Sequence, residues 1–333
     1  GIRTCRTRDL RIGDYLLSPK NISFSDTISN LHTSDFFWEE LELSRQSKEQ
    51  RLSYWKDIIQ RAAAQSGSCR KKAKRLRCDR VTMSRYIKAE SLGRLEEACY
   101  CGRPNLLWES DGFLWVGRNR VLPSEIPVSE DICELLGYAV ADGSVSSWGY
   151  VISLGNDPEL AERILTVYRR VFKCISGSIQ EVINSYGNPQ YAVVFPGRYV
   201  GKLIDRLVGH LASNKKIPDI IFNTSRKNQR SFLRALHTCD GHIGRDFGRS
   251  HEEFSIKTVS RRLASGLLFL FRSFGIHALV NSEEGIGNRR KSYKIGFHGN
   301  QFNKLGLRTA VDMKYSYLTR LEGIPKGLSE SKY

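Results

Sequence analysis

Two aspartates, Asp142 and Asp240, each follow an apolar segment and precede a glycine. The segments read LLGYAVADG, residues 135–143, and LRALHTCDG, residues 233–241. A carboxylate at the C-terminal end of a helix faces the negative end of the helix dipole, and two such ends together would repel each other unless a cation lay between them. Oxygen ligands with open water positions suit Mg²⁺, and metal ions beside a phosphodiester can activate water. This pair therefore indicates metal-assisted hydrolysis.

Small residues four positions apart precede both aspartates and predict how the two helices meet. They are Gly137 and Ala141 in the first segment, and Ala235 and Cys239 in the second. Residues four apart share one helix face, so each helix offers a small-residue strip along which the other can pack at close backbone distance. We expect the following glycines to end both helices in the left-handed conformation. Backbone carbonyl groups near Ala141 could also bind the metal, but the sequence does not indicate which of them would do so.

The surroundings of the two aspartates are also duplicated, from about residue 128 onward. Each half is expected to read helix, two strands, helix, two strands, helix, although the strand directly after each Asp-Gly is the least distinct. In the first half, Asp157 and Pro158 predict the start of the middle helix as its N-cap and N1 residues. An internal repeat of this kind points to pseudo-twofold symmetry. The sequence predicts an α+β fold with two αββαββα half-domains, residues 128–225 and 226–333, plus an N-terminal mixed α/β extension. The further expected elements are strands at 150–154, 178–184 and 190–196, a strand at 254–258, a helix at 260–274, strands at 276–282 and 291–298, and a closing helix.

These motifs resemble the LAGLIDADG homing endonucleases in their single-chain, two-motif form, over about residues 128–327. The resemblance implies that two antiparallel sheets form a saddle in the DNA major groove and that the last motif acids, Asp142 and Asp240, bind the metals. It also implies hydrolysis of both strands of a long double-stranded DNA site, leaving 3′ overhangs, with Mg²⁺ as cofactor and Mn²⁺ able to substitute. The sixth motif position carries Val140 and Thr238 in place of aspartate, but the cleavage acid is the eighth.

Two lysines are candidates for the catalytic site. The segment Asn214-Lys215-Lys216-Ile217-Pro218 resembles the family's Lys-x-Ile-Pro element, whose lysine lies beside the active site. Lys215, with Lys216 as the alternative, would stabilise charge on the scissile phosphate. Lys314 is the candidate in the second half. For any single lysine, the competing interpretation is a solvent-exposed charge.

Alternation along the strands predicts which side chains face DNA. In residues 292–298 the apolar side chains occupy the odd positions, so Lys294 and His298 are expected to point away from the helices. Ser255 and Lys257 alternate in the same way with Phe254 and Ile256. Phosphate contacts would set position, and groove-facing polar side chains would specify bases. The expected contacts of this half are Lys257, Arg289, Arg290, Lys294 and His298.

Residues 46–127 do not join the repeat and are expected to form a basic helical region. The run at residues 70–77 is followed by a segment, residues 81–87, that could start a recognition helix with Thr82 or Ser84 as its cap, as in a helix-turn-helix. A solvated helix face is the alternative. The expected DNA contacts here are Lys71, Lys72, Lys74, Arg75 and Arg85.

Residues 1–45 suggest an intein relationship. Residues 8–20 resemble a strand element of the Hint fold, the splicing domain of inteins, and many LAGLIDADG enzymes reside in inteins. The first residue is Gly1 and the last is Tyr333, so we expect no protein splicing from this chain.

Cys69, Cys78, Cys99 and Cys101 could bind zinc, but their spacing is unusual for such a site, and reduced thiols are the simpler interpretation.

The charge composition indicates which class of binding partner to expect. The formal net charge is +17, which favours a polyanion, most simply double-stranded DNA, with an anionic membrane surface as the competitor. The sequence shows no long apolar run and no signal peptide. We expect a monomer without a small-molecule cofactor, located inside the cell, in the cytoplasm or nucleoid, or in an organelle if a targeting segment was removed. The rival functions are an intron maturase and a non-cleaving regulator, and the presence of both aspartates argues against the regulator.

Overall fold

The computed structural model describes residues 26–45, 48–76, 80–95, 107–116, 119–146, 148–173, 176–183, 187, 189–245, 252–285 and 290–305. The chain divides into two compact units. Unit 1 contains Leu136–Asp142 and the residues from Leu207 onward, and unit 2 contains Ile28–Leu135 and Gly143–Arg206. The motif helix of the first half therefore contributes its C-terminal part to unit 1. The described helices include none that is long and apolar enough to cross a membrane.

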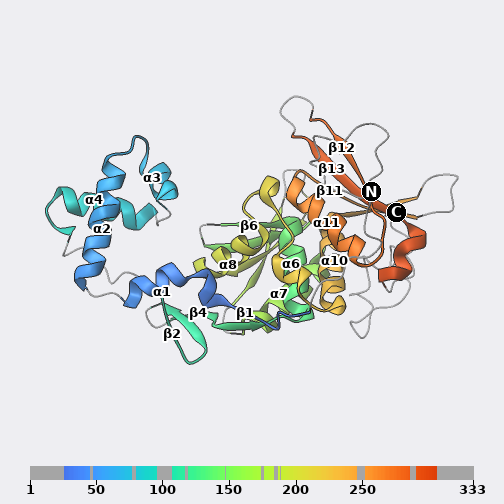
Figure 1. Cartoon of the computed structure of the whole chain (residues 1–333), viewed down its shortest axis with the longest axis horizontal. Coiled ribbons are helices and arrows are strands. Elements are labelled where there is room, and N and C mark those ends of the chain that lie inside the picture. Colours follow the sequence, from blue (N-terminus) through green and yellow to red (C-terminus); the bar gives the residue numbers. More distant parts are fainter. Residues whose placement is uncertain are drawn as a thin grey trace, which may run out of the picture. The chain divides into compact units, whose positions relative to one another are not determined.

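The first repeat follows the expected order of elements (Figure 1). Asp157 caps the middle helix α7, because its Oδ1 accepts a hydrogen bond of 2.9 Å from the Leu160 backbone N–H, and Pro158 is the first helical residue. Its Tyr168 ring stacks on Phe195 of the sheet at 4.1 Å between centroids. The elements are α6 (Glu130–Asp142), β6 (Gly143–Val145), β7 (Gly149–Ser153), α7 (Pro158–Phe172), β8 (Ser178–Ile183), β9 (Pro189–Pro196) and α8 (Arg198–Val208).

The second repeat copies this order. Aromatic rings join its helix α11 to its sheet. Phe271 of α11 packs edge-on against Phe254 and Phe297, at 5.4 and 5.1 Å between ring centroids. The closing segment is a 3₁₀ helix, and the chain from residue 306 lies outside the described residues. The elements are α10 (Arg226–Asp240), β10 (Gly241–Arg245), β11 (Glu252–Thr258), α11 (Arg261–Ser273), β12 (Leu279–Glu283), β13 (Ser292–His298) and η4 (Gly299–Leu305).

The two sheets have the same topology, which confirms the α+β duplication. Both are antiparallel and four-stranded, with orders β6-β7-β9-β8 and β10-β11-β13-β12. The least distinct strands of the sequence prediction, those directly after each Asp-Gly, are present as β6 and β10. Since a sheet of this kind is covered by helices on one face, alternate residues along its strands are apolar. The buried set is Tyr150, Ile152, Val193 and Phe195 in the first sheet, and Phe254, Ile256, Ile295 and Phe297 in the second.

A polar clamp joins each motif helix to the helix that follows it in the repeat. In unit 2, Arg163 of α7 donates two hydrogen bonds, of 2.8 and 2.7 Å, to the Glu134 carboxylate of α6. In unit 1, Arg226 of α10 donates to both Oγ and the carbonyl oxygen of Ser273 on α11, each at 2.5 Å. Bidentate contacts of this kind fix geometry as well as contribute energy.

The N-terminal region differs from expectation in two ways. Helix α4 begins at Arg80, so Thr82 and Ser84 lie inside it and neither is its cap. Residues 107–123 form a three-stranded sheet where only helices were expected. Its first turn is Asp111-Gly112, with φ of 52° and 74°, and an Asp-Gly pair with positive φ is the residue choice that a tight hairpin requires. The sequence signal was present and was missed.

A pair of short strands joins the predicted regions 1–45 and 46–127. Strand β1 of the first region pairs antiparallel with β5 of the second, within unit 2. The Hint-like residues 8–20 lie outside the described residues. The elements of this region are β1 (Asn30–His32), η2 (Thr33–Phe36), α1 (Trp38–Arg45), α2 (Lys48–Ala63), α3 (Cys69–Arg75), α4 (Arg80–Ser91), β2 (Leu107–Ser110), β3 (Phe113–Val116), β4 (Asn119–Pro123) and β5 (Glu125–Pro127).

Candidate active site

The C-terminal part of α6 packs directly on α10 within unit 1. A Cβ added to Gly137 would lie 2.7 Å from the Ala235 Cβ and 3.0 Å from the Leu236 backbone N, and it would overlap the Phe232 carbonyl oxygen. Only glycine permits this approach of one helix backbone to another. The small residues of the motifs therefore lie at the contact, as their spacing predicts.

The glycines after the two aspartates do not adopt the expected conformation. Gly143 has φ −83° and ψ 143°, and Gly241 has φ −80° and ψ 143°, which is extended backbone and not the left-handed region. Each helix continues directly into a strand, so no left-handed turn is needed to end it. At Gly241 the reason for glycine is space, because an added Cβ would overlap the His237 ring and carbonyl oxygen.

Asp142 and Asp240 lie at these helix ends, where the charge of Asp142 acts on Asp240. Burial raises the pKa of Asp142 above its usual range, whereas a hydrogen bond from Cys239 and the positive charge of Lys215 lower it. Burial, followed by the charge of Asp142, raises the pKa of Asp240 from 3.8 to about 7, and Lys215 opposes this. The site is therefore short of positive charge, as expected for two carboxylates without a bound cation.

Lys215 is held in place by the backbone on both sides. Its side chain is 6% exposed, and its Nζ donates a 2.5 Å hydrogen bond to the carbonyl oxygen of Ala139 in the last turns of α6. Its own carbonyl oxygen accepts a 2.6 Å bond from Ser260 Oγ. Because this ammonium group is buried beside both aspartates, it contributes a fixed positive charge to them.

A tight loop places Lys215 beside the aspartates and directs the side chain of Lys216 away from them. Gly209 has φ 91°, and an added Cβ would overlap the Asn214 carbonyl oxygen, so the loop needs glycine for both conformation and space. The backbone N–H of Lys216 donates to the Val208 carbonyl oxygen at 2.8 Å. The Lys216 ammonium group lies 3.8 Å from the Asp219 carboxylate. Of the two alternatives, Lys215 is therefore the one beside the aspartates.

Sequence reasoning missed two members of this cluster. Cys239 was considered only as a small residue, yet its thiol donates to the Asp142 carboxylate. Ser260 was considered only as part of a helix start, and it both caps α11 through the Leu263 backbone N–H at 3.2 Å and donates to Lys215. No spacing in the sequence indicates either contact, because each joins elements far apart along the chain.

The donor set suits a divalent cation that keeps water or substrate ligands. The described residues contain no group of three or more His, Cys, Asp or Glu side chains arranged to hold a metal ion. Two carboxylates are what Mg²⁺ commonly takes from a protein when waters and phosphate oxygens complete its coordination. The raised pKa values of both aspartates are the feature of the structure that fits such an ion.

The outward face of the second sheet carries the predicted groups with one exception. Lys257 and Lys294 are directly paired across β11 and β13, and Lys257 also forms a 2.5 Å ion pair with Glu283. His298 is exposed. Ser255 was expected to face outward beside them but is 3% exposed, because it lies on a central strand between His242 and Gly296.

The remaining predicted residues fall into two groups. Arg290 is exposed, as are Lys71, Lys74, Arg75 and Arg85 of the N-terminal helices, and Lys72 is half-buried. Outside the described residues lie Lys314 and Arg289, together with Cys78, Cys99 and Cys101 of the zinc hypothesis. Cys69 is a half-buried free thiol.

Comparison with known proteins gives one family match. Residues 227–310 match the model of a LAGLIDADG-like domain. The ATP-dependent DNA helicase Hel308 of Thermococcus kodakarensis is 30% identical over 192 residues, which cover 55% of this chain and 16% of the helicase. The replication factor C small subunit of Methanocaldococcus jannaschii is 28% identical over 213 residues, 62% of this chain and 11% of that protein. The chain thus spans less than a fifth of these curated relatives.

Solved structures of low similarity include variants of the homing endonuclease I-DmoI, with a TM-score of 0.40 and 12% identity over 54% of this chain and 94% of that one. I-DmoI in complex with DNA and Mn has a TM-score of 0.39 and 14% identity over 60% and 99%. The matched domain begins at the second motif helix and includes Asp240, and the first half repeats its order of elements. Residues 227–310 of the chain therefore match a LAGLIDADG-like domain, as the second motif indicated.

Proposed function

We propose that this protein is a site-specific endonuclease that hydrolyses both strands of double-stranded DNA with a divalent metal at the Asp142 and Asp240 carboxylates. The observation that carries the proposal is the meeting of these two acids with the buried ammonium group of Lys215. A merely structural pair of helix ends would not need two partly buried acids whose pKa values are both raised.

The chain's own residues have separate roles in this proposal. Asp142 and Asp240 provide carboxylate oxygens for the cation, and the hydrogen bond from Cys239 favours the ionised form of Asp142 against the effect of burial. Lys215, fixed by Ala139 and Ser260, places positive charge where a scissile phosphate gains negative charge. When bound, the divalent cation supplies a Lewis acid that activates water and stabilises the departing oxygen. Mg²⁺ is the proposed ion, with Mn²⁺ as a substitute.

The positive surface supports duplex DNA as the substrate. Lys257 and Lys294 are paired across β11 and β13, Lys257 is exposed although it also pairs with Glu283, and the chain carries a formal net charge of +17. Charge of this size strengthens binding to a polyanion through counterion release. Solved relatives include I-DmoI in complex with DNA and Mn. We further propose staggered cuts that leave 3′ overhangs, made by a monomer that works inside the cell.

The genomic setting is part of the same proposal. The curated relatives include a DNA helicase, DNA polymerases and a replication factor C small subunit, and each shares only a small part of its length with this chain. A segment common to proteins with such different names has the distribution of a mobile insert, so we propose an origin within an intein.

The experiment is selective cutting of a randomised duplex library with the full chain and Mg²⁺. We expect a discrete cut site for the wild type, and Asp142→Asn or Asp240→Asn should bind that site without cutting it. Asp219→Asn, a change at an 85% exposed aspartate, is the matched control and should cut normally. Cutting that survives both substitutions would remove the proposed site, and binding of structured RNA with no cleavage of any duplex would favour the maturase.

A further inference from the structure

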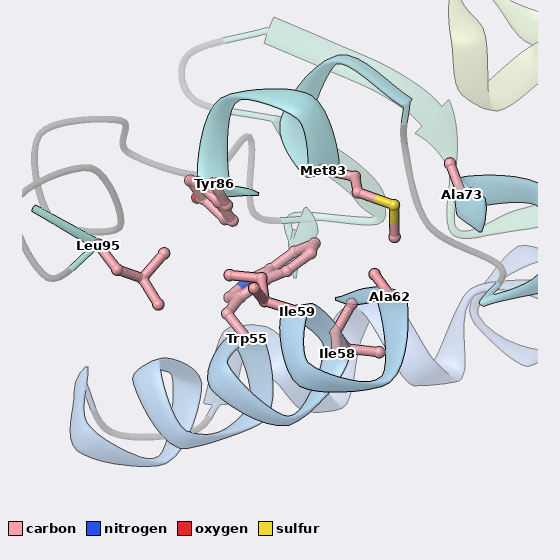
Figure 2. Packing of buried hydrophobic residues seen from close by; sticks show 8 residues of the cluster. All are labelled: Trp55, Ile58, Ile59, Ala62, Ala73, Met83, Tyr86 and Leu95. Atoms are coloured by element: carbon pink, nitrogen blue, oxygen red, sulfur yellow. The ribbon is translucent and has the colours of Figure 1, made fainter. Parts of the chain in front are cut away.

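Helices α2, α3 and α4 enclose a hydrophobic core of their own. Figure 2 shows side chains of α2 and α4 pointing toward one another, with the Trp55 and Tyr86 rings edge-to-face at 4.7 Å between centroids. Burial of Met83, Tyr86 and Ala89 fixes which face of α4 points inward. The core residues are Trp55, Ile58, Ile59, Ala62, Ala73, Met83, Tyr86 and Leu95.

The outward face of α4 is basic with one exposed apolar residue. Val81, Ser84, Arg85 and Lys88 follow helical spacing and are all exposed, so they form one stripe opposite the buried residues. Val81 is 74% exposed, so its methyl groups are available for contact. Arg85 lies with its guanidinium carbon 5.1 Å from the Tyr86 ring centroid, which orients the guanidinium group.

Helix α3 adds a second basic surface. It is CRKKAKR, with no acidic residue in its seven positions. The Cys69 thiol lies 3.9 Å from the carbonyl oxygen of Arg80, so the starts of α3 and α4 are adjacent. Exposed bases of α3 are Arg70, Lys71, Lys74 and Arg75.

The charge is not evenly distributed over this helical module. Helix α2 carries both signs on its exposed face, where Arg61 forms an ion pair with Asp57. Within the described part of the chain, the exposed bases of α3 and those of α4 form no ion pair. Clustering of unneutralised positive charge on two adjacent helices favours a polyanion at this face.

We propose that α3 and α4 form a second duplex-DNA contact, in which α4 enters the major groove with Arg85 at the base edges, while Lys88 and the bases of α3 bind phosphates. An α-helix fits the major groove, where arginine can pair with guanine, serine with several bases, and an aliphatic group with the thymine methyl. This combination of side chains occupies the outward stripe of α4. The stripe has no Trp, Phe or Leu that a membrane-bound helix would insert. The contact would add to the DNA contacts of the sheets in the proposed function, and it does not depend on cleavage.

The test compares two double variants of the full chain with equal loss of charge. Arg85→Ala with Lys88→Ala removes two bases from α4, and Lys56→Ala with Arg61→Ala removes two from α2. Affinity for a long duplex is measured in EDTA at several salt concentrations, and hydroxyl-radical footprints are recorded. Because each lost phosphate contact lowers the slope of log affinity against log salt by about 0.9, loss of the Lys88 contact should decrease the slope by about 0.9 in the α4 variant, and the α2 variant should show less than half of that decrease. The footprint should shorten at one end only for the α4 variant.

A charge-conserving variant separates base reading from general attraction. Arg85→Lys keeps the positive charge but not the paired donors of arginine, so it should keep the salt slope and lose base preference at one or two positions. Equal slopes and footprints for the two double variants would overturn the proposal. So would a larger loss of affinity for structured RNA or for anionic vesicles than for duplex DNA. All readings are made without metal, so a protein that never cuts DNA still tests this contact, and the thermal unfolding midpoint checks the fold of each variant.

Discussion

Asp240→Asn should stabilise the metal-free protein at alkaline pH. The structure places an ionised Asp240 in partial burial beside Asp142, and its pKa is raised from 3.8 to about 7. Asparagine has nearly the same shape and no charge. The substitution therefore removes an unfavourable charge while keeping the packing around it.

The magnitude follows from the pKa. Since one pKa unit corresponds to about 1.4 kcal/mol, a carboxyl raised from 3.8 to about 7 makes the ionised folded state roughly 4 kcal/mol less stable above pH 7. The folded protein binds this proton more tightly than the unfolded chain, so stability falls as the pH rises from about 4 to about 7 and then stays constant. The gain from Asp240→Asn should be about 2–4 kcal/mol at pH 8, about 1–2 kcal/mol at pH 5, and absent below pH 4.

The assay is urea unfolding in EDTA at pH 8 and pH 5, followed by far-ultraviolet circular dichroism. Asp219→Asn is the control, because it makes the same chemical change at an exposed carboxylate and should alter stability by less than about 0.5 kcal/mol. Adding Mg²⁺ at pH 8 should stabilise the wild type more than Asp240→Asn. A variant that is less stable than the wild type at pH 8, or a difference that does not change with pH, would refute the electrostatic interpretation of the site.

Other substitutions test the remaining contacts. Gly137→Ala should lower the free energy of unfolding by about 1–3 kcal/mol, because the added methyl group meets the α10 backbone; Gly155→Ala, where a Cβ would meet nothing within 4 Å, is the control, and equal melting temperatures would contradict the prediction. Lys215→Met should lower the rate of DNA cutting by roughly 10²–10³ in single-turnover assays while duplex binding changes little, and Lys216→Met should cut normally; a loss of binding equal to the loss of rate would argue against this role. Cys239→Ala removes a hydrogen bond that lowers the pKa of Asp142, so the acidic limb of the pH–rate profile should move to higher pH, whereas Cys239→Ser should leave it close to that of the wild type. An unshifted profile for Cys239→Ala would show that this bond does not control ionisation at the site.

The Asp-Gly hairpin at residues 111–112 shows where local signals were sufficient but overlooked. Its residue types alone specify a tight turn, so the hairpin of β2 and β3 was predictable. The left-handed glycine caps show the opposite case. Gly143 and Gly241 satisfy the usual sequence rule for a helix end, yet both are extended because a strand begins immediately after each helix.

The amino-acid sequence by itself determined the duplication, the order of elements and the identity of the two aspartates, because hydrophobic periodicity and small-residue spacing are local properties. Tertiary structure alone decided which lysine stands beside them, that Cys239 donates to Asp142, and that Ser255 is buried. It also set the proton affinity of Asp240. These features depend on the packing of α6, α10 and the loop at residues 209–218 against one another, and electrostatic interactions in a partly buried site follow distance and burial rather than position along the chain.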